Sequence, residues 1–441
     1  MGRLAGQPEA LPVPAVRSPG LELPVYGTLS LPSAQDEGPP DGLTLDGALE
    51  LMVRQNPDLQ SKYQELPKAA ADVLSAGLLG NPLLFGSVDN APYGSYSPQR
   101  PGEVGYSLTV IQPFDVNHKR RVRVLAAQRA QNVLEAQYQD AVRTAADAVY
   151  SAYVDVLAAR DTVRYLETSL NGLNRMAEAT SKQVEFEQEA NIVLDRVLLQ
   201  RDTTQIALEE ALVSARQARQ SLAALLGAPN DPEVLLDVRG SLQRTTTPVP
   251  PLDELIGLAN ASRPDLVAYR LGVNRAQADV QLQRKEGFPD VFVLYTPWAL
   301  TDNSAIGGQN ATAWSLGALA SVPIFNRNQG NVRRAEATVV QSRIELAAVD
   351  RRVEFEVRQA YQDYEVSQAA ARRLEETMLP RAQNVLSLSQ LSRERGQIGI
   401  LELLAAEREY SEVVRRYRDS LIRARRAELR LNTAAAMRII R

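Results

Sequence analysis

The chain has 441 residues, with 49 Lys and Arg against 53 Asp and Glu, and only 5% aromatic residues. This balance lacks the basic excess that nucleic acid attracts, so we expect no nucleic-acid partner. The chain has no Cys and a single His, His118. This composition excludes a disulfide framework, thiolate chemistry and a multi-histidine metal site.

Residues 1–41 form a Pro-rich extension. They contain no apolar core of a secretory signal, so we expect the true start of an exported chain to lie upstream. Nowhere do about 18 apolar residues run together, which predicts no transmembrane helix. This absence does not exclude membrane-spanning strands, because such strands alternate apolar with polar residues.

The first half of the chain, residues 42–230, begins with a short helix and continues with two alternating segments, 83–89 and 103–112. In the second of these, Tyr106 and Leu108 fall on one side while Ser107 falls on the other. A period of two predicts strands.

A helical hairpin is predicted over 116–227. One apolar row recurs every seven residues over five heptads: Val142, Val149, Val156, Val163 and Leu170. This period predicts a coiled coil. A helix from Val116 to Glu185 would be roughly 100 Å long, which suits a protein that crosses a compartment.

The second half repeats the first with an offset of about 207 residues, after a linker over 231–251. The matched strings are Pro57-Asp58-Leu59 with Pro264-Asp265-Leu266 and Ala71-Asp72-Val73 with Ala278-Asp279-Val280. Residues 252–437 therefore form a second unit of the same kind. Its strands are predicted at 290–296 and 312–323, and its helical hairpin at 329–436.

Four strands are too few to close a barrel, and a single copy would leave two unpaired edges. Three copies would supply about twelve strands and could close one, as a membrane-spanning sheet must. The predicted fold is therefore mainly α: long coiled-coil hairpins forming a trimeric α-barrel, joined to a shared membrane β-barrel.

The ordered motifs resemble the TolC-like outer-membrane efflux family over about 43–436. Those that carry the resemblance are Leu43-Thr44-Leu45-Asp46-Gly47-Ala48-Leu49, Gln112-Pro113-Phe114, Val322-Pro323-Ile324-Phe325-Asn326-Arg327-Asn328-Gln329-Gly330 and Gly396-Gln397-Ile398. The string from Phe325 to Gly330 is most similar to the branch that serves heavy-metal efflux pumps.

The resemblance implies a passive exit duct of a tripartite, RND-type efflux system, placed in the outer membrane and extending into the periplasm. Its partners would be two further copies of the chain, a periplasmic adaptor protein, an inner-membrane pump and outer-membrane lipid. It implies no enzyme activity, cofactor or resident metal. Metal cations are the first expected substrate and toxic organic compounds the second.

The resemblance also implies a gate at the periplasmic tip. Glu402 falls where the family carries a constriction carboxylate, while the second acidic position is occupied by Ala405. Asp195 and Arg393 are the predicted latch between neighbouring hairpins, and Gly396 supplies the tight turn. A solvated helix-start charge for Glu402, and an ordinary surface pair for Asp195 and Arg393, remain the alternatives.

Two further features have competing interpretations. His118 beside Lys119 is expected in a basic belt facing lipid headgroups or an interface, rather than as a metal ligand. The strand-associated aromatics fit either an interfacial girdle or loop packing: Tyr93, Tyr96, Tyr106, Tyr295, Trp298 and Trp314.

A soluble coiled-coil scaffold is the alternative function. It accounts for the heptads, but gives no reason for strand pairs at matching places in both halves.

Overall fold

The computed structural model describes residues 39–186, 190–228, 237–242 and 248–437, so most of the Pro-rich extension lies outside the described residues. The described chain is mainly helical with four strands in one sheet, which confirms the expected fold class. It divides into two compact units, each taking segments from both halves of the repeat. None of the described helices is long and apolar enough to span a membrane.

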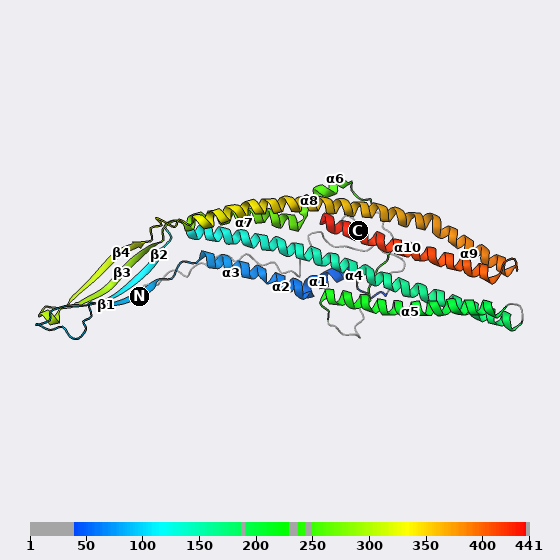
Figure 1. The fold of residues 1–441 in the computed structure, drawn as a ribbon, viewed down its shortest axis with the longest axis horizontal. Helices are drawn as coiled ribbons and strands as arrows, with labels where there is room; N and C mark the ends of the chain where they lie inside the picture. Colours follow the sequence, from blue (N-terminus) through cyan, green and yellow to red (C-terminus); the bar gives the residue numbers. More distant parts are fainter. Residues whose placement is uncertain (1–38, 187–189, 229–236, 243–247, 438–441) are drawn as a thin grey trace. The chain divides into compact units, whose positions relative to one another are not determined.

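Unit 1 contains the sheet, in residues 65–135 and 268–347. The strands are β1 (Leu83–Asp89), β2 (Val104–Phe114), β3 (Val291–Asp302) and β4 (Ala311–Ala320). All neighbours are antiparallel in the order β1-β2-β3-β4, so β1 and β4 are the edges (Figure 1). The helical parts are α3 (Glu65–Gly77), the start of α4 (Lys119–Glu185), most of α7 (Pro264–Glu286) and the start of α8 (Gln329–Arg373).

β3 continues to Asp302, beyond Pro297, where the alternating pattern is interrupted in sequence. Pro297 has no N–H to donate to a neighbouring strand. The register with β4 shifts between Thr296 and Ala299, and the register with β2 shifts opposite it. A bulge at this place accommodates the proline without ending the strand.

In the middle of the sheet, on β2 and β3, two hydroxyl groups are buried while neighbouring apolar side chains are exposed. Thr109 and Thr296 are only 7% and 8% exposed and share a hydrogen bond of 2.8 Å. By contrast, Leu108 is 39% and Tyr295 47% exposed. This is the reverse of a sheet that packs an apolar face on a core.

Small residues join α7 to α8 within unit 1, where the two helices run side by side (Figure 1). Ala276 and Val280 of α7 form a buried cluster with Ala335 and Val339 of α8. Small side chains at this contact allow the two helices to approach closely.

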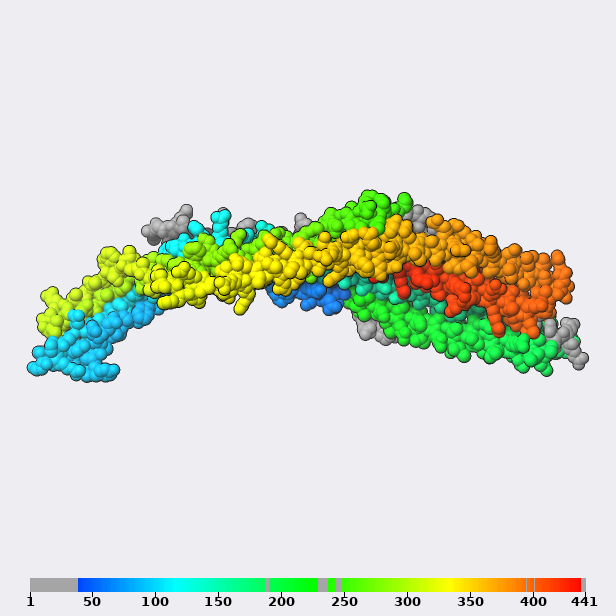
Figure 2. Space-filling view, turned by 45° about the horizontal axis from the view of Figure 1, so that its top comes forward, coloured from blue at the N-terminus to red at the C-terminus, as the bar shows by residue number. Residues whose placement is uncertain are grey.

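Unit 2 consists of helices. They are α1 (Leu45–Gln55), α2 (Pro57–Tyr63), the rest of α4, α5 (Asn191–Leu226), α6 (Leu252–Ser262), the rest of α8, α9 (Leu379–Glu394) and α10 (Ile400–Ala435). α9 and α10 lie side by side, orange and red in Figure 2. The predicted heptad row of α4 lies in the core here, with Val149 fully buried and Val156 3% exposed.

A π-helical turn, Leu374–Met378, separates α8 from α9. Pro380 follows in the first turn of α9. Proline lacks the N–H for an intrahelical hydrogen bond and clashes with the preceding turn, so the helix widens before it.

The two halves secure their last helix in the same way. Asn56, just before α2, donates its amide to the carbonyl of Leu225 near the end of α5, at 2.8 Å. Arg263, just before α7, donates to the carbonyl of Ala434 near the end of α10, at 3.3 Å. Each donor precedes a proline, which holds it in extended backbone and aims it at the helix end.

The residues that terminate these helices, Gly227 and Ala436, both adopt left-handed backbone, with φ of 70° and 49°. A Cβ on Gly227 would lie 2.3 Å from the carbonyl oxygen of Gln55. We expect Gly227→Ala to lower the free energy of unfolding by more than the roughly 1–2 kcal/mol of left-handed strain, because this clash is added. Thermal unfolding followed by circular dichroism measures it.

Ala436→Gly is the matched control for Gly227→Ala. Relief of the left-handed strain is offset by the loss of a fully buried methyl group, worth about 0.8 kcal/mol. We therefore expect a change below about 1 kcal/mol. Equal effects of the two substitutions would contradict the steric argument.

Candidate functional site: strand-to-helix junctions and hairpin turns

The first strand-to-helix junction is organised by Asp115, between β2 and α4. Its carboxylate accepts hydrogen bonds from the backbone N–H groups of Lys119 at 2.7 Å and Arg120 at 2.8 Å. N–H groups at the start of a helix have no partner within the helix, and the helix dipole there also favours a negative charge. Asp115 therefore fixes where the long helix begins.

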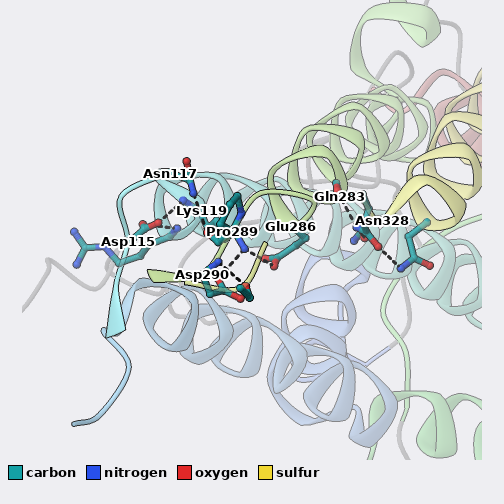
Figure 3. Close-up of polar contacts among 11 residues, drawn as sticks. Asp115, Asn117, Lys119, Gln283, Glu286, Pro289, Asp290 and Asn328 are labelled. Atoms are coloured by element: carbon teal, nitrogen blue, oxygen red, sulfur yellow. Dashed lines mark hydrogen bonds and ion pairs between the residues drawn. The ribbon is translucent and has the colours of Figure 1, made fainter. Parts of the chain in front are cut away.

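Lys119 ties this junction to the start of β3. The lysine is buried, with its Nζ 2.8 Å from Asp290 Oδ1 and 3.7 Å from Glu286 Oε2 (Figure 3). Asn117 adds a hydrogen bond of 2.9 Å to the carbonyl of Pro289. The basic residue predicted in a headgroup-facing belt is thus held by carboxylates within its own protomer.

Left-handed residues occupy equivalent places in the two junctions. His118, with φ of 56°, directly precedes α4, and Asn328, with φ of 62°, directly precedes α8. Pro113 and Pro323 stand five residues before them. His118 is exposed and makes the turn into the helix, and no metal-ligand set surrounds it among the described residues.

The second junction is held mainly by amides. Asn326 accepts from the N–H of Asn328 at 3.0 Å, and Gln329 accepts from the N–H of Arg327 at 2.7 Å. Asn328 also donates to the carbonyl of Gln283 in α7 at 2.8 Å (Figure 3). These contacts give four residues of the predicted motif a structural role.

The other motif residues lie at the surface of the second junction. Phe325 is 91% exposed, Pro323 is half-buried, and Gly330 has open space where a side chain would lie. Gly287, by contrast, is required sterically, since a Cβ there would lie 2.5 Å from the carbonyl oxygen of Arg327.

The turn between α9 and α10 contains two of the predicted gate residues. Gly396 has φ of 72°, as a tight turn requires. Arg393 donates to the side-chain oxygen of Gln183, near the end of α4, at 3.1 Å, and to the carbonyl of Ile398 at 3.4 Å. Arg393 therefore links the turns of both hairpins within one protomer.

Asp195 and Glu402 are both exposed, in the first turns of α5 and α10. The contacts of Arg393 described above do not involve Asp195. The latch between Asp195 and Arg393 therefore stays a prediction, as a contact between neighbouring protomers. Most of the first turn, residues 187–189, lies outside the described residues.

A cavity of about 500 Å³, which no sequence pattern predicted, is lined by α4, α5 and α10 in unit 2. One oxygen of Glu407 is buried there with no hydrogen-bond partner among the described residues. Burial raises the pKa of the Glu407 carboxyl. Tyr165 lines the same cavity, and burial is the largest influence that raises the pKa of its hydroxyl. Arg408 and Arg415 line the cavity as well.

A raised pKa in the folded state means that Glu407 favours folding when protonated. Its contribution is fully present below the unfolded pKa of about 4.5 and is lost as pH rises through the folded value. We expect Glu407→Gln to raise the melting temperature at pH 8 and to change it little at pH 4.5. Circular dichroism at both pH values checks this, with the exposed Glu409→Gln as control. An equal gain at both values would contradict it.

The strand-associated aromatics are largely exposed. Trp314 is 69%, Trp298 45% and Tyr295 47% exposed, while Tyr93 in the β1–β2 loop is 98% exposed. Within the described ranges, no three His, Cys, Asp or Glu side chains converge as metal ligands would. The exposed aromatic side chains therefore offer a surface for lipid or for another chain rather than a catalytic pocket.

Curated proteins of related sequence are found among metal-resistance proteins. The chain is 26% identical over 375 residues to the cobalt-zinc-cadmium resistance protein CzcC of Cupriavidus metallidurans, covering 85% of each chain. It is 26% identical over 315 residues to the nickel and cobalt resistance protein CnrC of the same organism, covering 71% of this chain and 70% of that one.

Solved structures with the same fold include VceC of Vibrio cholerae and CusC. VceC matches with a TM-score of 0.72 at 19% identity, over 89% of this chain and 96% of that chain. CusC matches with a TM-score of 0.72 at 18% identity, over 92% and 99%. Both likenesses show that the chain has this fold.

The family model for outer membrane efflux proteins matches residues 48–228 and 255–436, which are the two halves of the repeat. The chain belongs to the outer membrane efflux protein family: it is an efflux channel of the outer membrane that extends into the periplasm, and not an enzyme.

Proposed function

We propose that three copies of this chain form the passive exit duct of a tripartite efflux system. The observation that carries this is the middle of the sheet, where Thr109 and Thr296 are buried while Leu108 and Tyr295 are exposed. A bilayer can cover such an apolar face, whereas water cannot do so without cost.

The sheet edges support a shared barrel. β4 is exposed along its whole length, and β1 nearly so. An exposed edge offers unpaired N–H and C=O groups, which cannot be left bare in a membrane. Pairing β4 of one copy with β1 of the next, three times, leaves no edge.

The duct needs partners to supply energy and to reach the inner membrane. Membership of the outer membrane efflux family supports an inner-membrane pump that drives transport and a periplasmic adaptor that joins this pump to the duct. The hairpins α4–α5 and α9–α10 are the elements that such an adaptor would meet.

Metal cations are the proposed substrate class. The support is the sequence similarity to proteins named for cobalt, zinc, cadmium and nickel resistance. Glu402 would place three carboxylates around the axis, which favours cations. Ala405 leaves this ring without a second acidic row.

Deletion of the gene tests the proposal. We expect lower tolerance to cobalt, zinc, cadmium or nickel salts, restored by the full chain in trans. Organic toxicants are the second arm, since greater sensitivity to them alone would move the substrate class away from metals. Unchanged tolerance to every metal and organic compound tried would contradict an export role.

A further inference from the structure

A second cavity, in unit 1, lies at the first junction, where β2 ends and α4 begins. Its volume is about 350 Å³, and it is lined from α4, from the end of β2, from the residues after α3 and from the start of β3. Figure 3 shows the polar contacts beside it, among Asp115, Asn117, Lys119 and Asp290.

The two acidic side chains that line this cavity already have partners within the protein. Asp115 accepts two backbone N–H groups of α4, and Asp290 is paired with Lys119. Arg120 and Arg123 also line the cavity and are exposed, and neither has an ion-pair partner among the described residues. The one side-chain contact of Arg120 is long, 3.5 Å to the carbonyl of Gly77. Two guanidinium groups therefore remain for an anion.

The rim of the same cavity is apolar and exposed. Leu78 and Leu79, which follow α3, are 60% and 64% exposed, while Phe114 and Val116 are 52% and 55% exposed. A free phosphate ion would make no apolar contact with such a rim. A molecule with an anionic head and a hydrocarbon tail satisfies both parts.

We propose that this cavity binds the phosphodiester headgroup of an anionic glycerophospholipid, with acyl chains against Leu78, Leu79 and Phe114. Guanidinium groups match phosphate oxygens in geometry and charge. The proposal rests on the outer-membrane placement, because the ends of membrane strands lie at headgroup depth.

The repeat indicates one such site per protomer. When Asn328 is aligned with His118, Gly330 of the second junction stands where Arg120 stands in the first. Arg333 still matches Arg123 in position. The second junction therefore lacks one of the two guanidinium groups.

Native mass spectrometry of the full-length trimer in a non-ionic detergent tests the site, with dioleoyl phosphatidylglycerol as the probe. We expect one tightly bound lipid per protomer, and at least about tenfold weaker binding in Arg120→Gln/Arg123→Gln. The matched control is Arg333→Gln/Arg334→Gln, which removes the same charge from exposed positions at the start of α8 and should bind as the unmodified chain does.

Two other probes separate the sources of binding. Dioleoylglycerol, which lacks the phosphate, should bind weakly, and inorganic phosphate should not displace the lipid. Unchanged binding in Arg120→Gln/Arg123→Gln, equal binding of dioleoylglycerol, or displacement by inorganic phosphate would overturn the proposal. Failure of the duct itself would show differently, as an unmodified chain that gives no trimer and no conductance.

Discussion

Leu199→Glu combined with Ile206→Glu should abolish the trimer. Ile192, Leu199, Ile206 and Val213 recur every seven residues along α5 and are 62%, 67%, 58% and 43% exposed. The core of the protomer uses other positions of α5, such as Val193, Val197 and Leu222. The stripe is therefore left for a second helix, as in a coiled coil.

The partner of this stripe should be α9 of the neighbouring copy. Val385, Leu388 and Leu391 on α9 are 47%, 55% and 41% exposed. Figure 2 shows α5, in green, uncovered along one side. Burying Leu199 or Ile206 contributes roughly 1.5–3 kcal/mol at each of three interfaces, and a carboxylate there would add a desolvation cost.

Trimer loss is measured as disappearance of the heat-resistant trimer band and as monomer mass in light scattering. Gln205→Glu is the control, because Gln205 is exposed on another side of α5 and bonded only to Glu209 among the described residues. A trimer that survives both glutamates would show that the stripe faces solvent or another partner.

The parts of the fold predictable from sequence are those written in local periodicity. The alternation in β2 and the heptads through Val149 and Val156 depend only on spacing, so they can be read from the chain. The two-fold repeat is a longer period of the same kind. The π-helical turn at Leu374–Met378, by contrast, is not announced by any such period.

The missed features depend on residues far apart in sequence. Arg263 is 2% exposed and, besides the nearby Asp265, it pairs with Glu356 of α8, a contact that no spacing announces. The same holds for Lys119 with Asp290 and for the buried carboxylate oxygen of Glu407. The gate residues are a third case, since their proposed contacts lie between protomers.

Asp195→Ala combined with Arg393→Ala should raise the single-channel conductance or the open fraction in a planar bilayer. One exposed ion pair contributes only about 0 to 1 kcal/mol and could not hold a gate alone. Three pairs that break together contribute up to roughly 3 kcal/mol, which shifts the open population by about a hundredfold. Symmetry thus makes a weak contact sufficient.

Arg393 has a second way to close the turns, and control variants separate the two. Its bond to Gln183 joins the hairpins within one protomer, so Gln183→Ala tests the internal link alone. Arg395→Ala removes a neighbouring exposed charge and should leave conductance unchanged. If Asp195→Ala alone has no effect while Gln183→Ala opens the channel, Arg393 acts inside its own protomer. If the double variant conducts as the unmodified chain does, neither link holds the gate, and the carboxylates of Glu402 become the remaining candidate for the constriction.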